Sequence, residues 1–271
     1  MKPLSELTAG EAKQLAGVVF DLDDTVLDHG ALGEEAYAAL FRLRETGLRL
    51  LACTGRPAGW GEVIARQWPI DAVVVENGAV AFVVEPASGP GPRRVVASDA
   101  LPPAERRARR RELLGFADEI IARFPETGLA DDNDARRSDV TLDVGEHRKV
   151  DAESVRRITE LARERGVRTL VSSIHLHLTH EADDKASGTI RLLVERFGED
   201  ATGARARYAF VGDSANDAAA FAGFALTFGV QNVTAHVSRL TVPPRYVAKA
   251  PMGRGFAEIA GKLVALRAQR G

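Results

Sequence analysis

The sequence has only one cysteine, Cys53, in a chain of 271 residues. A single cysteine excludes an internal disulfide bond and favours a reducing compartment. No apolar run is long enough to span a bilayer. Polar residues such as Glu6 and Glu11 precede any long apolar run, which argues against a signal peptide. We therefore expect a cytoplasmic protein with no membrane partner.

The sequence also lacks an excess of charge of either sign. Its 36 Lys and Arg residues nearly balance its 38 Asp and Glu residues, for a formal net charge of -2. This balance gives no electrostatic case for nucleic acid as the main partner. The composition, 45% hydrophobic and 27% charged, is that of an ordinary globular protein, and the length suits one large domain or two modest ones. No pattern points to a protein partner, so the oligomeric state is left open.

The stretch VVFDLDDTVLD, residues 18–28, joins an apolar segment to a run of carboxylates. The apolar segment is typical of a strand buried on both faces of a parallel sheet. Asp21 and Asp23 follow it, at the strand end where ligands bind in open α/β sheets. Side chains two residues apart on an extended backbone point to the same side. Carboxylates this close repel one another unless a cation or a proton lies between them, so the stretch predicts a divalent metal such as Mg²⁺.

Strands and helices alternate on both sides of a long insertion. Before the insertion, the pattern predicts helices at 3–15 and 33–46, strands at 18–20, 48–53 and 72–75, and a return strand at 79–84 after an Asn77-Gly78 turn. After it, the pattern predicts helices at 185–197, 217–222 and 255–268 and strands at 206–211, 225–229 and 246–248. The β-α-β-α-β order favours a parallel sheet with right-handed crossovers.

The composition changes between these two parts. A segment rich in Pro and Gly at 86–92 predicts a linker. The residues after it predict helices at 104–124 and 151–165 and strands at 138–144 and 167–178. We therefore predict an inserted α+β domain at 86–179, between the two halves of a core at 1–85 and 180–271.

Polar residues also follow the strand predicted at 48–53. Thr54 and Gly55 precede a helix that Pro57 can start. Backbone N–H groups point outward at a helix start, so this segment predicts an anion site, although Thr54 alone is also consistent with a helix N-cap. The polar residues at helix starts further along the chain are Lys185, Asp213, Asn216 and Asp217.

In chain order, these polar segments read FDLDDT, LACTGR, DDKASG and FVGDSANDAAAF. They resemble the four motifs of the haloacid dehalogenase superfamily of phosphohydrolases. The insertion falls between the second and third motifs, as in the type-IIB branch of Cof, sucrose-phosphate, trehalose-phosphate and mannosyl-phosphoglycerate phosphatases. The resemblance covers most of 17–85 and 183–260. It implies a Rossmann-like α/β core with a parallel sheet and an inserted α+β cap.

The resemblance also implies a role for each residue. Asp21 would be the nucleophile that forms an aspartyl-phosphate, and Asp23 would protonate the leaving oxygen and then activate water. The residues around the transferring phosphoryl group would be Thr54, Gly55, Lys185 and Asn216. The ligands of Mg²⁺ would be Asp21, the backbone carbonyl of Asp23, Asp213 and, directly or through water, Asp217.

Several residues keep more than one interpretation. Asp24 suits a structural loop carboxylate better than a further metal ligand. The residue after Lys185 is alanine, where the family more often has glycine. Asn77 either turns the hairpin or contacts the substrate, and Arg137 and Asp139 are candidate substrate contacts in the cap.

Two further features of the insertion are also ambiguous. The helix predicted at 104–124 carries a cluster of arginines, which suits a solvated helix face or the recognition of an anion. His175 and His177 share one face of their strand. They could bind a transition metal or face a cleft or solvent.

Together the motifs predict a Mg²⁺-dependent phosphatase acting on a small phosphorylated metabolite, with a sugar phosphate as the preferred class. One rival is a phosphomutase of the phosphomannomutase type, which would need a second phosphate site in the cap. Another is a non-catalytic sensor of phosphorylated metabolites, although a binder has no need for Asp23 beside Asp21. The fold does not fix the substrate, and Mg²⁺ rather than Mn²⁺ follows from the family.

Overall fold

The computed structural model describes residues 1–86, 91–172 and 174–269. Contacts divide the chain into two compact units. The first comprises Met1–Gly55, Gly61–Ser98 and Asp183–Gly271, and the second comprises Arg56–Trp60 and Asp99–Ala182. The linker predicted at 86–92 lies largely outside the described residues, and an independent domain at 86–179 stays a prediction.

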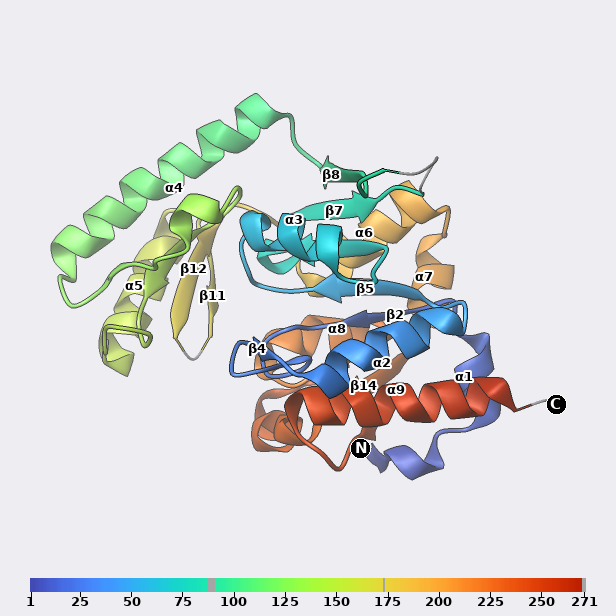
Figure 1. The fold of residues 1–271 in the computed structure, drawn as a ribbon. Helices are drawn as coiled ribbons and strands as arrows, with labels where there is room; N and C mark the ends of the chain where they lie inside the picture. The colour runs from blue at the N-terminus through green and yellow to red at the C-terminus, as the bar shows by residue number, and fades with distance from the viewer. Residues whose placement is uncertain (87–90, 173, 270–271) are drawn as a thin grey trace. The chain divides into compact units, whose positions relative to one another are not determined.

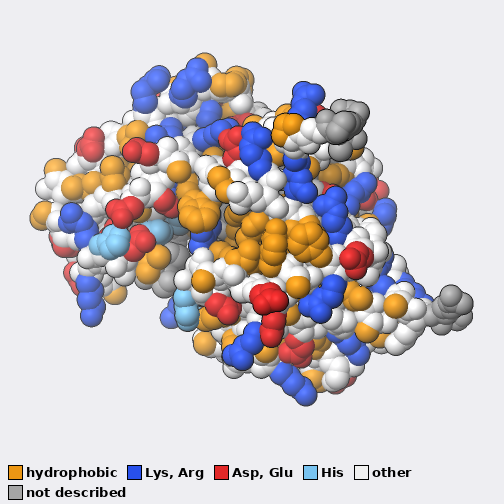
Figure 2. All heavy atoms as spheres, in the orientation of Figure 1, with side chains coloured by type: hydrophobic (Ala, Val, Ile, Leu, Met, Phe, Trp, Pro, Cys, Tyr) orange, Lys and Arg blue, Asp and Glu red, His pale blue; other side chains and the backbone are white. Residues whose placement is uncertain are grey.

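None of the helices in the described ranges combines the length and the apolar character needed to cross a membrane. On the face that Figure 2 shows, basic and acidic side chains are interspersed rather than segregated. This pattern agrees with the balanced charge of the sequence.

A mainly parallel sheet forms the centre of the first unit (Figure 1). In spatial order its strands are β1 (Lys2–Pro3), β15 (Tyr246–Val247), β14 (Leu226–Gly229), β13 (Tyr208–Gly212), β2 (Gly17–Phe20), β5 (Arg49–Cys53), β6 (Ala72–Val75), β7 (Val80–Val84) and β8 (Val95–Asp99). The pairs from β1 to β6 are parallel, and β7 returns antiparallel to β6. The sheet confirms the predicted α/β class.

The strand β2 lies where the strand order reverses. The chain continues from β2 to β5 and β6 on one side, whereas β13, β14 and β15 lie on the other. Every residue of β2 is buried, as expected for a strand covered on both faces. Ligands in such sheets bind beyond the carboxyl ends of the strands at the reversal. Asp21 occupies this position, and its backbone N–H donates to the carbonyl of Val211 at 2.9 Å.

Helices lie on both faces of this sheet. They are α1 (Ala9–Gln14), α2 (Glu34–Glu45), α3 (Ala58–Gln67), α6 (Lys185–Phe197), α7 (Ala201–Arg207), α8 (Ala218–Gly223) and α9 (Met252–Ala268). Alternate residues of β2 point to opposite faces. Val19 joins a core cluster with Leu193 of α6 and Phe221 of α8. Phe20 packs on the other side, with its ring centroid 5.2 Å from that of Phe256 in α9.

The helix α6 begins at a capping box. The Asp184 side chain accepts hydrogen bonds from the backbone N–H groups of Ala186 and Ser187, and the Ser187 hydroxyl accepts one from the Asp184 N–H. The helix ends at Gly198, whose φ of 71° suits glycine. Because the cap fixes the first turn, it also fixes the backbone position from which the side chain of Lys185, the first helical residue, extends.

The second unit contains a separate antiparallel sheet with the strand order β11 (Arg168–Val171), β12 (His175–Thr179), β10 (Val140–Asp143) and β9 (Gly128–Leu129). The helices α4 (Pro103–Arg123) and α5 (Ala152–Glu164) pack on this sheet (Figure 1). One core cluster joins Leu142 and Leu176 of the sheet to Phe116 of α4 and Ile158 of α5. The residues that alternate with them, such as His177, therefore lie on the other face of the sheet.

The prediction of one strand at 167–178 is wrong. Two strands, β11 and β12, form an antiparallel pair there, with Leu170 opposite His177. The Ser172 hydroxyl accepts hydrogen bonds from the backbone N–H groups of Ile174 and His175, which closes the turn between the strands. Apolar residues continue on both sides of this turn, so the sequence pattern does not reveal it.

Other boundaries also differ from the prediction. The strand expected at 206–211 begins at Tyr208, because helix α7 occupies the residues before it and is capped by Asp200. The helix expected at 3–15 is a short 3-10 turn followed by α1. The strand β8 and the 3-10 helix η5 (Gln231–Arg239) have no counterpart among the predicted elements.

The turn between β6 and β7 packs directly against α6. A Cβ atom added at Gly188 would overlap the carbonyl oxygen of Gly78, and one added at Gly78 would overlap the carbonyl oxygen of Asp184. Because these neighbours are backbone atoms, they cannot swing aside. The approach of the turn to the start of α6 therefore depends on both glycines.

Replacing Gly188 tests this contact. Gly188→Ala should lower the free energy of unfolding by about 1–3 kcal/mol, because the methyl group forces packed backbone apart. The matched control is Gly115→Ala in α4, where a new Cβ would meet nothing within 4 Å. It should raise stability by up to about 1 kcal/mol through helix propensity. Denaturant unfolding measures both, and equal stability of the two variants would contradict the contact.

Candidate active site

Three buried carboxylates meet beyond the carboxyl ends of β2 and β13. Asp21 follows β2, Asp213 follows β13, and Asp217 closes the 3-10 turn η4 (Ala215–Asp217). Each offers one oxygen, and these oxygens lie within 4.8 Å of one another. Because β13 pairs with β2, residues that are far apart in the sequence meet where the strand order reverses.

Lys185 reaches this group from the first turn of α6. Its Nζ donates to Oδ1 of Asp21 at 2.8 Å and to Oδ1 of Asp217 at 2.7 Å. Its side chain is only 1% exposed. A buried ammonium needs such partners, because removing a charge from water without pairing it costs several kcal/mol or more. A lysine at the start of a helix is usually solvated, whereas Lys185 is buried against these two carboxylates.

The carboxylates strongly affect one another's protonation. Burial raises the pKa of Asp21 to about 7 although the Lys185 ammonium opposes the shift. Burial, with the charges of Asp217 and Asp21, raises the pKa of Asp213 to about 8. Burial would lower the pKa of Lys185, but Asp21 and Asp217 outweigh it and raise that pKa well above its usual value. Lys185 therefore stays charged while the acids resist ionisation.

This donor set fits a hard divalent cation. When ionised, the three carboxylates exceed the charge of the single ammonium. A cation between them would remove the repulsion that raises the pKa values of Asp21 and Asp213. Carboxylate oxygens are the ligands preferred by Mg²⁺ and similar ions. Among the described residues, this cluster is the group of acids, histidines and cysteines whose geometry suits a metal.

Asp217 has its own partners within the protein. Its Oδ2 accepts hydrogen bonds from the backbone N–H groups of Asp213 at 2.9 Å and Ser214 at 3.2 Å, while its Oδ1 accepts from Lys185. Both of its oxygens thus bond to nearby donors. Asp217 therefore holds the loop after β13 and orients Lys185, whatever further role it has.

Asp23 differs from Asp21 in its surroundings. Its side chain is exposed, whereas that of Asp21 is buried. Its carboxylate is not part of the three-carboxylate cluster. Asp24, the next residue, has a left-handed φ of 55°, and its carboxylate accepts from the backbone N–H of His29 at 3.2 Å. The structure thus gives Asp24 a place in the loop, as the sequence favoured.

The segment after β5 lies beside the turn after β6. Thr54 is buried, and its N–H donates to the carbonyl of Val74 at 2.9 Å. The backbone N–H of Asn77 donates to the carbonyl of Thr54 at 3.1 Å. A Cβ on Gly55 would lie 3.1 Å from Asn77 Oδ1, so the Asn77 side chain is next to Gly55. The structure therefore brings Asn77 to the predicted anion site.

Asn77 is held in an uncommon conformation. Its φ is 56°, and that of Glu76 is 50°, so two consecutive residues other than glycine have left-handed backbones. Such conformations cost on the order of 1–3 kcal/mol each and persist where the surroundings require them. The Asn77 side chain is buried, yet its Oδ1 lacks a hydrogen-bond partner in the described protein. A strained turn thus presents a polar group that the protein does not satisfy.

The remaining predicted residues lie in different environments. Asn216 is exposed in η4, and Arg137 is exposed in the second unit. Asp139 is buried and accepts hydrogen bonds from Arg136 at 3.0 and 3.1 Å, and its Oδ2 lies 3.0 Å from Nδ1 of His177. Burial opposes ionisation, but Arg136 and His177 outweigh it and lower the pKa of Asp139. Its partners within the second unit suit a structural carboxylate better than a substrate contact.

The histidines and arginines of the second unit also have partners. His175 Nε2 lies 2.9 Å from Glu146, and His177 Nδ1 lies 3.0 Å from the Thr141 hydroxyl. Arg106 is buried between Asp99 and Glu181. The interpretation of the arginine cluster as a wholly solvated face is therefore wrong for Arg106, whose charge these acids balance.

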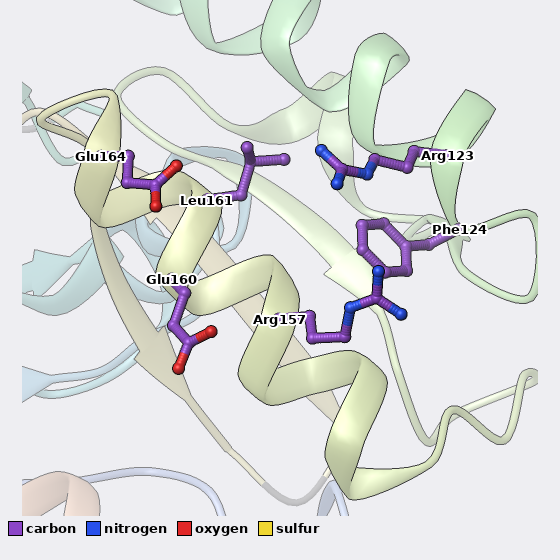
Figure 3. Close-up of a pocket in the computed structure, with 6 residues that line it drawn as sticks. All are labelled: Arg123, Phe124, Arg157, Glu160, Leu161 and Glu164. Atoms are coloured by element: carbon purple, nitrogen blue, oxygen red, sulfur yellow. The ribbon is translucent and has the colours of Figure 1, made fainter.

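A shallow pocket of about 140 Å³ lies on the helices of the second unit (Figure 3). The guanidinium groups of Arg123 and Arg157 approach the Phe124 ring, at 5.9 and 5.4 Å from its centroid. The residues that line it are Arg123, Phe124, Arg157, Glu160, Leu161 and Glu164. None of these residues belongs to the predicted site. The lining has two arginines and two glutamates, so their charges balance.

Two residues of the site were missed at the sequence level. Thr25 donates from its hydroxyl to Asp213 Oδ1 at 3.0 Å, and Asn232 donates from Nδ2 to Asp213 Oδ2 at 3.0 Å. Thr25 lies within the first acidic motif, so its position offered a signal. Asn232 lies in η5, which the sequence pattern did not predict, and a lone Asn in a loop gives no sign of a long-range contact.

The sequence and the fold were compared with those of known proteins. Residues 18–88 match the model of a family described as haloacid dehalogenase-like hydrolase. The comparison with curated proteins gave no match.

Several solved structures share the fold. A Thermoplasma acidophilum protein has 18% identity and a TM-score of 0.70, covering 92% of this chain and 98% of its own. The sucrose-phosphatase of Synechocystis, solved with sucrose and phosphate, has 17% identity and a TM-score of 0.60, covering 93% and 98%. A subclass IIB sugar phosphatase has 18% identity and a TM-score of 0.57, covering 92% and 99%. These structures show the fold of a core with an inserted cap.

The raised pKa values predict how metal and pH act on stability. Because the folded acids Asp21 and Asp213 bind protons more tightly than unfolded aspartate, metal-free protein should lose stability as pH rises from about 4 to about 8. Mg²⁺ should therefore raise the melting temperature more at pH 8 than at pH 5. Thermal melts with Mg²⁺ and with EDTA measure this.

Asp213→Asn removes one of the repelling charges. It should flatten the pH dependence and abolish most of the stabilisation by Mg²⁺. Asp118→Asn, at an exposed position of α4, is the control and should behave as the wild type. A Mg²⁺ effect that is equal at both pH values, or that survives in Asp213→Asn, would contradict the assignment of the cluster.

Proposed function

We propose that this protein is a Mg²⁺-dependent phosphatase that acts on a small phosphorylated metabolite through an aspartyl-phosphate. The match of residues 18–88 to a haloacid dehalogenase-like hydrolase family supports the proposal. The observation that carries the proposal is the buried group of Asp21, Asp213, Asp217 and Lys185 at the end of β2. This group combines a carboxylate at the site of reaction, a fixed ammonium and a set of oxygen ligands for a cation.

In this proposal, Asp21 is the nucleophile. The Lys185 ammonium bonds to its Oδ1 at 2.8 Å, which fixes the orientation of the carboxylate. One Asp21 oxygen attacks phosphorus, the bond from phosphorus to the ester oxygen breaks, and the phosphoryl group passes to Asp21. Water then attacks the same phosphorus, which releases phosphate and regenerates the carboxylate. Each step transfers one phosphoryl group and needs no oxidant or reductant.

Asp23 is the proposed general acid and base. Its exposed side chain lies outside the buried cluster, where it can exchange protons with substrate or water. In the first step it donates a proton to the leaving oxygen, and in the second it takes one from water. Two aspartates two positions apart thus have different tasks because their surroundings differ.

The groups proposed to hold the transferring phosphoryl group come from three further segments. They are Thr54, the backbone N–H of Gly55, Lys185 and Asn216. The proposed metal ligands are Asp21, the backbone carbonyl of Asp23, Asp213 and, directly or through water, Asp217. When bound, the cation supplies charge stabilisation to the phosphoryl oxygens.

We further propose that Asn77 contacts the substrate. Its carboxamide lies next to Gly55, and its Oδ1 has no hydrogen-bond partner among the described residues. As an acceptor, this oxygen suits a hydroxyl or another donor of the substrate. The strained turn then has a functional reason, because the left-handed backbone directs this amide to the phosphoryl site.

Two structures with the same fold are described as a sucrose-phosphatase and a sugar phosphatase, and a sugar phosphate is therefore the class to test first. A phosphomutase would need a second phosphate site. Arg106 and Arg109 of α4 both pair with Glu181, so they have less capacity to hold another phosphate. A sensor would not require the exposed Asp23. Arg137 remains a candidate for contact with the substrate. Asp139 could affect substrate binding only indirectly, through its partners Arg136 and His177.

The proposed function is tested by phosphate release from a panel of sugar phosphates and other phosphomonoesters, with Mg²⁺ and with EDTA. The wild type should hydrolyse one or a few esters only with the metal. Asp21→Asn should lower kcat by at least about 10⁴-fold, since a nucleophile is lost. Asp23→Asn should lower it by about 10²–10⁴-fold, as expected when general acid–base catalysis is removed.

The neighbouring Asp24→Asn is the matched control. Its carboxylate bonds to the His29 backbone, and asparagine tolerates the left-handed φ of 55°. It should keep a rate within a few-fold of the wild type. The nucleophile assignment is overturned if Asp21→Asn retains the wild-type rate, and the phosphatase proposal fails if the metal changes no rate across the panel.

Asn77→Gly tests the proposed substrate contact separately. Glycine adopts the left-handed φ of 56° without strain, so the fold should be retained. Losing the hydrogen bond that the Asn77 Oδ1 accepts from the substrate should lower kcat/KM by about 3- to 10-fold. Steady-state kinetics together with thermal melts measure both effects. An unchanged kcat/KM in a stable variant would contradict the substrate contact and would mean that Asn77 only forms the turn.

A further inference from the structure

Asn232 joins three segments that are far apart in the sequence. It lies in η5, just after β14, and is half-buried. Its Nδ2 donates to the carbonyl of Asp24 at 3.0 Å and to Oδ2 of Asp213 at 3.0 Å. Its Oδ1 accepts from the backbone N–H of Met252 at 3.1 Å. One side chain thus bonds to the first acidic loop, to the loop after β13 and to the start of α9.

These partners determine which way the carboxamide faces. The Asp24 carbonyl oxygen only accepts hydrogen bonds, whereas the Met252 backbone N–H only donates, and these two partners alone fix the orientation. The amide nitrogen must therefore face Asp24 and Asp213, and the amide oxygen must face Met252. Both N–H groups of the Asn232 carboxamide donate and its oxygen accepts one hydrogen bond, so these partners fix its orientation.

Asn232 also bonds to two residues with left-handed backbones. Asp24 has a φ of 55°, and Met252 has a φ of 48°. Residues other than glycine in this conformation are strained by on the order of 1–3 kcal/mol. They keep it only when neighbouring groups require it. The hydrogen bonds between Asn232 and these two backbones help to stabilise the left-handed conformations.

Asn232 also helps to fix the orientation of the Asp213 carboxylate. Thr25 donates to its Oδ1, and Asn232 donates to its Oδ2. Two donors on the two oxygens of one carboxylate stop it from rotating about its Cβ–Cγ bond. The carboxylate is thereby held facing Asp21 and Asp217, with which it forms the oxygen cluster.

We propose that Asn232 is a positioning residue that orients Asp213 for the divalent cation and holds the loop at Asp24, next to the proposed ligand carbonyl of Asp23. This inference rests on the proposed function, since it assigns Asn232 a part in building the metal site of that reaction. In this role Asn232 would contact neither the cation nor the substrate. It acts through the Asp213 carboxylate, whose Oδ2 it holds with a donated hydrogen bond at 3.0 Å.

A different role for Asn232 would be simply to anchor α9. The start of α9 has a second anchor on the same loop, because Asp28 Oδ1 accepts from the backbone N–H of Gly253 at 2.7 Å. Asp28 does not bond to Asp213 in the contacts described here. Asp28→Ala therefore removes an anchor of α9 without removing a donor to the metal-binding carboxylate, and it separates the two roles.

The test is calorimetric titration of Mg²⁺ into the metal-free protein, which needs no substrate. Asn232→Ala should weaken Mg²⁺ binding by about 10- to 100-fold, the usual effect of removing a group that orients a metal ligand. The matched control is Thr234→Ala in the same 3-10 helix, which loses only a bond to the carbonyl of Gln231. It should bind Mg²⁺ as the wild type does. Asn232→Ser provides a smaller change if the alanine variant unfolds.

Kinetics give a second readout in the wild type and in these variants. Asn232→Ala should raise the Mg²⁺ concentration needed for half-maximal activity by a similar factor, while excess Mg²⁺ restores most of kcat. An unchanged Mg²⁺ affinity in a folded Asn232 variant overturns the proposal, as does an equal loss of affinity in Asp28→Ala. If the wild type binds Mg²⁺ but hydrolyses no ester, the phosphatase proposal fails while the calorimetric test of Asn232 still stands.

Discussion

The rest of the site depends on the buried ion cluster of Lys185 with Asp21 and Asp217. Burying any of these charges alone would cost several kcal/mol or more, so each needs the others. Nearby Asp213 adds negative charge that the single ammonium does not balance, and burial raises the pKa values of Asp21 and Asp213. The fold thus maintains an arrangement that is unfavourable in isolation and that a bound cation would relieve.

The architecture supplies this cluster from separate elements. The reversal of strand order at β2 brings Asp21 beside the loop after β13. The capping box of Asp184 fixes the start of α6, and close glycine contacts hold that start against the turn at Gly78. The cluster is therefore positioned by backbone packing and caps, while the loops that complete it carry the strained residues, including Asn77 and Met252.

The sequence was most informative where local signals and long-range order coincide. Buried strands followed by polar residues predicted β2, β5 and β6. The motifs also contain the four residues that the structure joins, Asp21, Lys185, Asp213 and Asp217. The hairpin of β11 and β12 was missed because apolar residues continue on both sides of the Ser172 turn. Asn232 was missed for another reason: its three hydrogen bonds depend on tertiary positions that no local pattern encodes. The partners that bury Arg106 and Asp139 are likewise visible only in the folded chain.

The most direct measurement is a crystal structure of the protein with Mg²⁺ and vanadate, which mimics a transferring phosphoryl group. The account predicts Mg²⁺ at about 2.0–2.1 Å from oxygens of Asp21 and Asp213. It also predicts vanadium facing the Asp21 carboxylate, with Lys185 and Thr54 bonded to the vanadate oxygens. A cation bound away from the cluster, or vanadate bound away from Asp21, would contradict it.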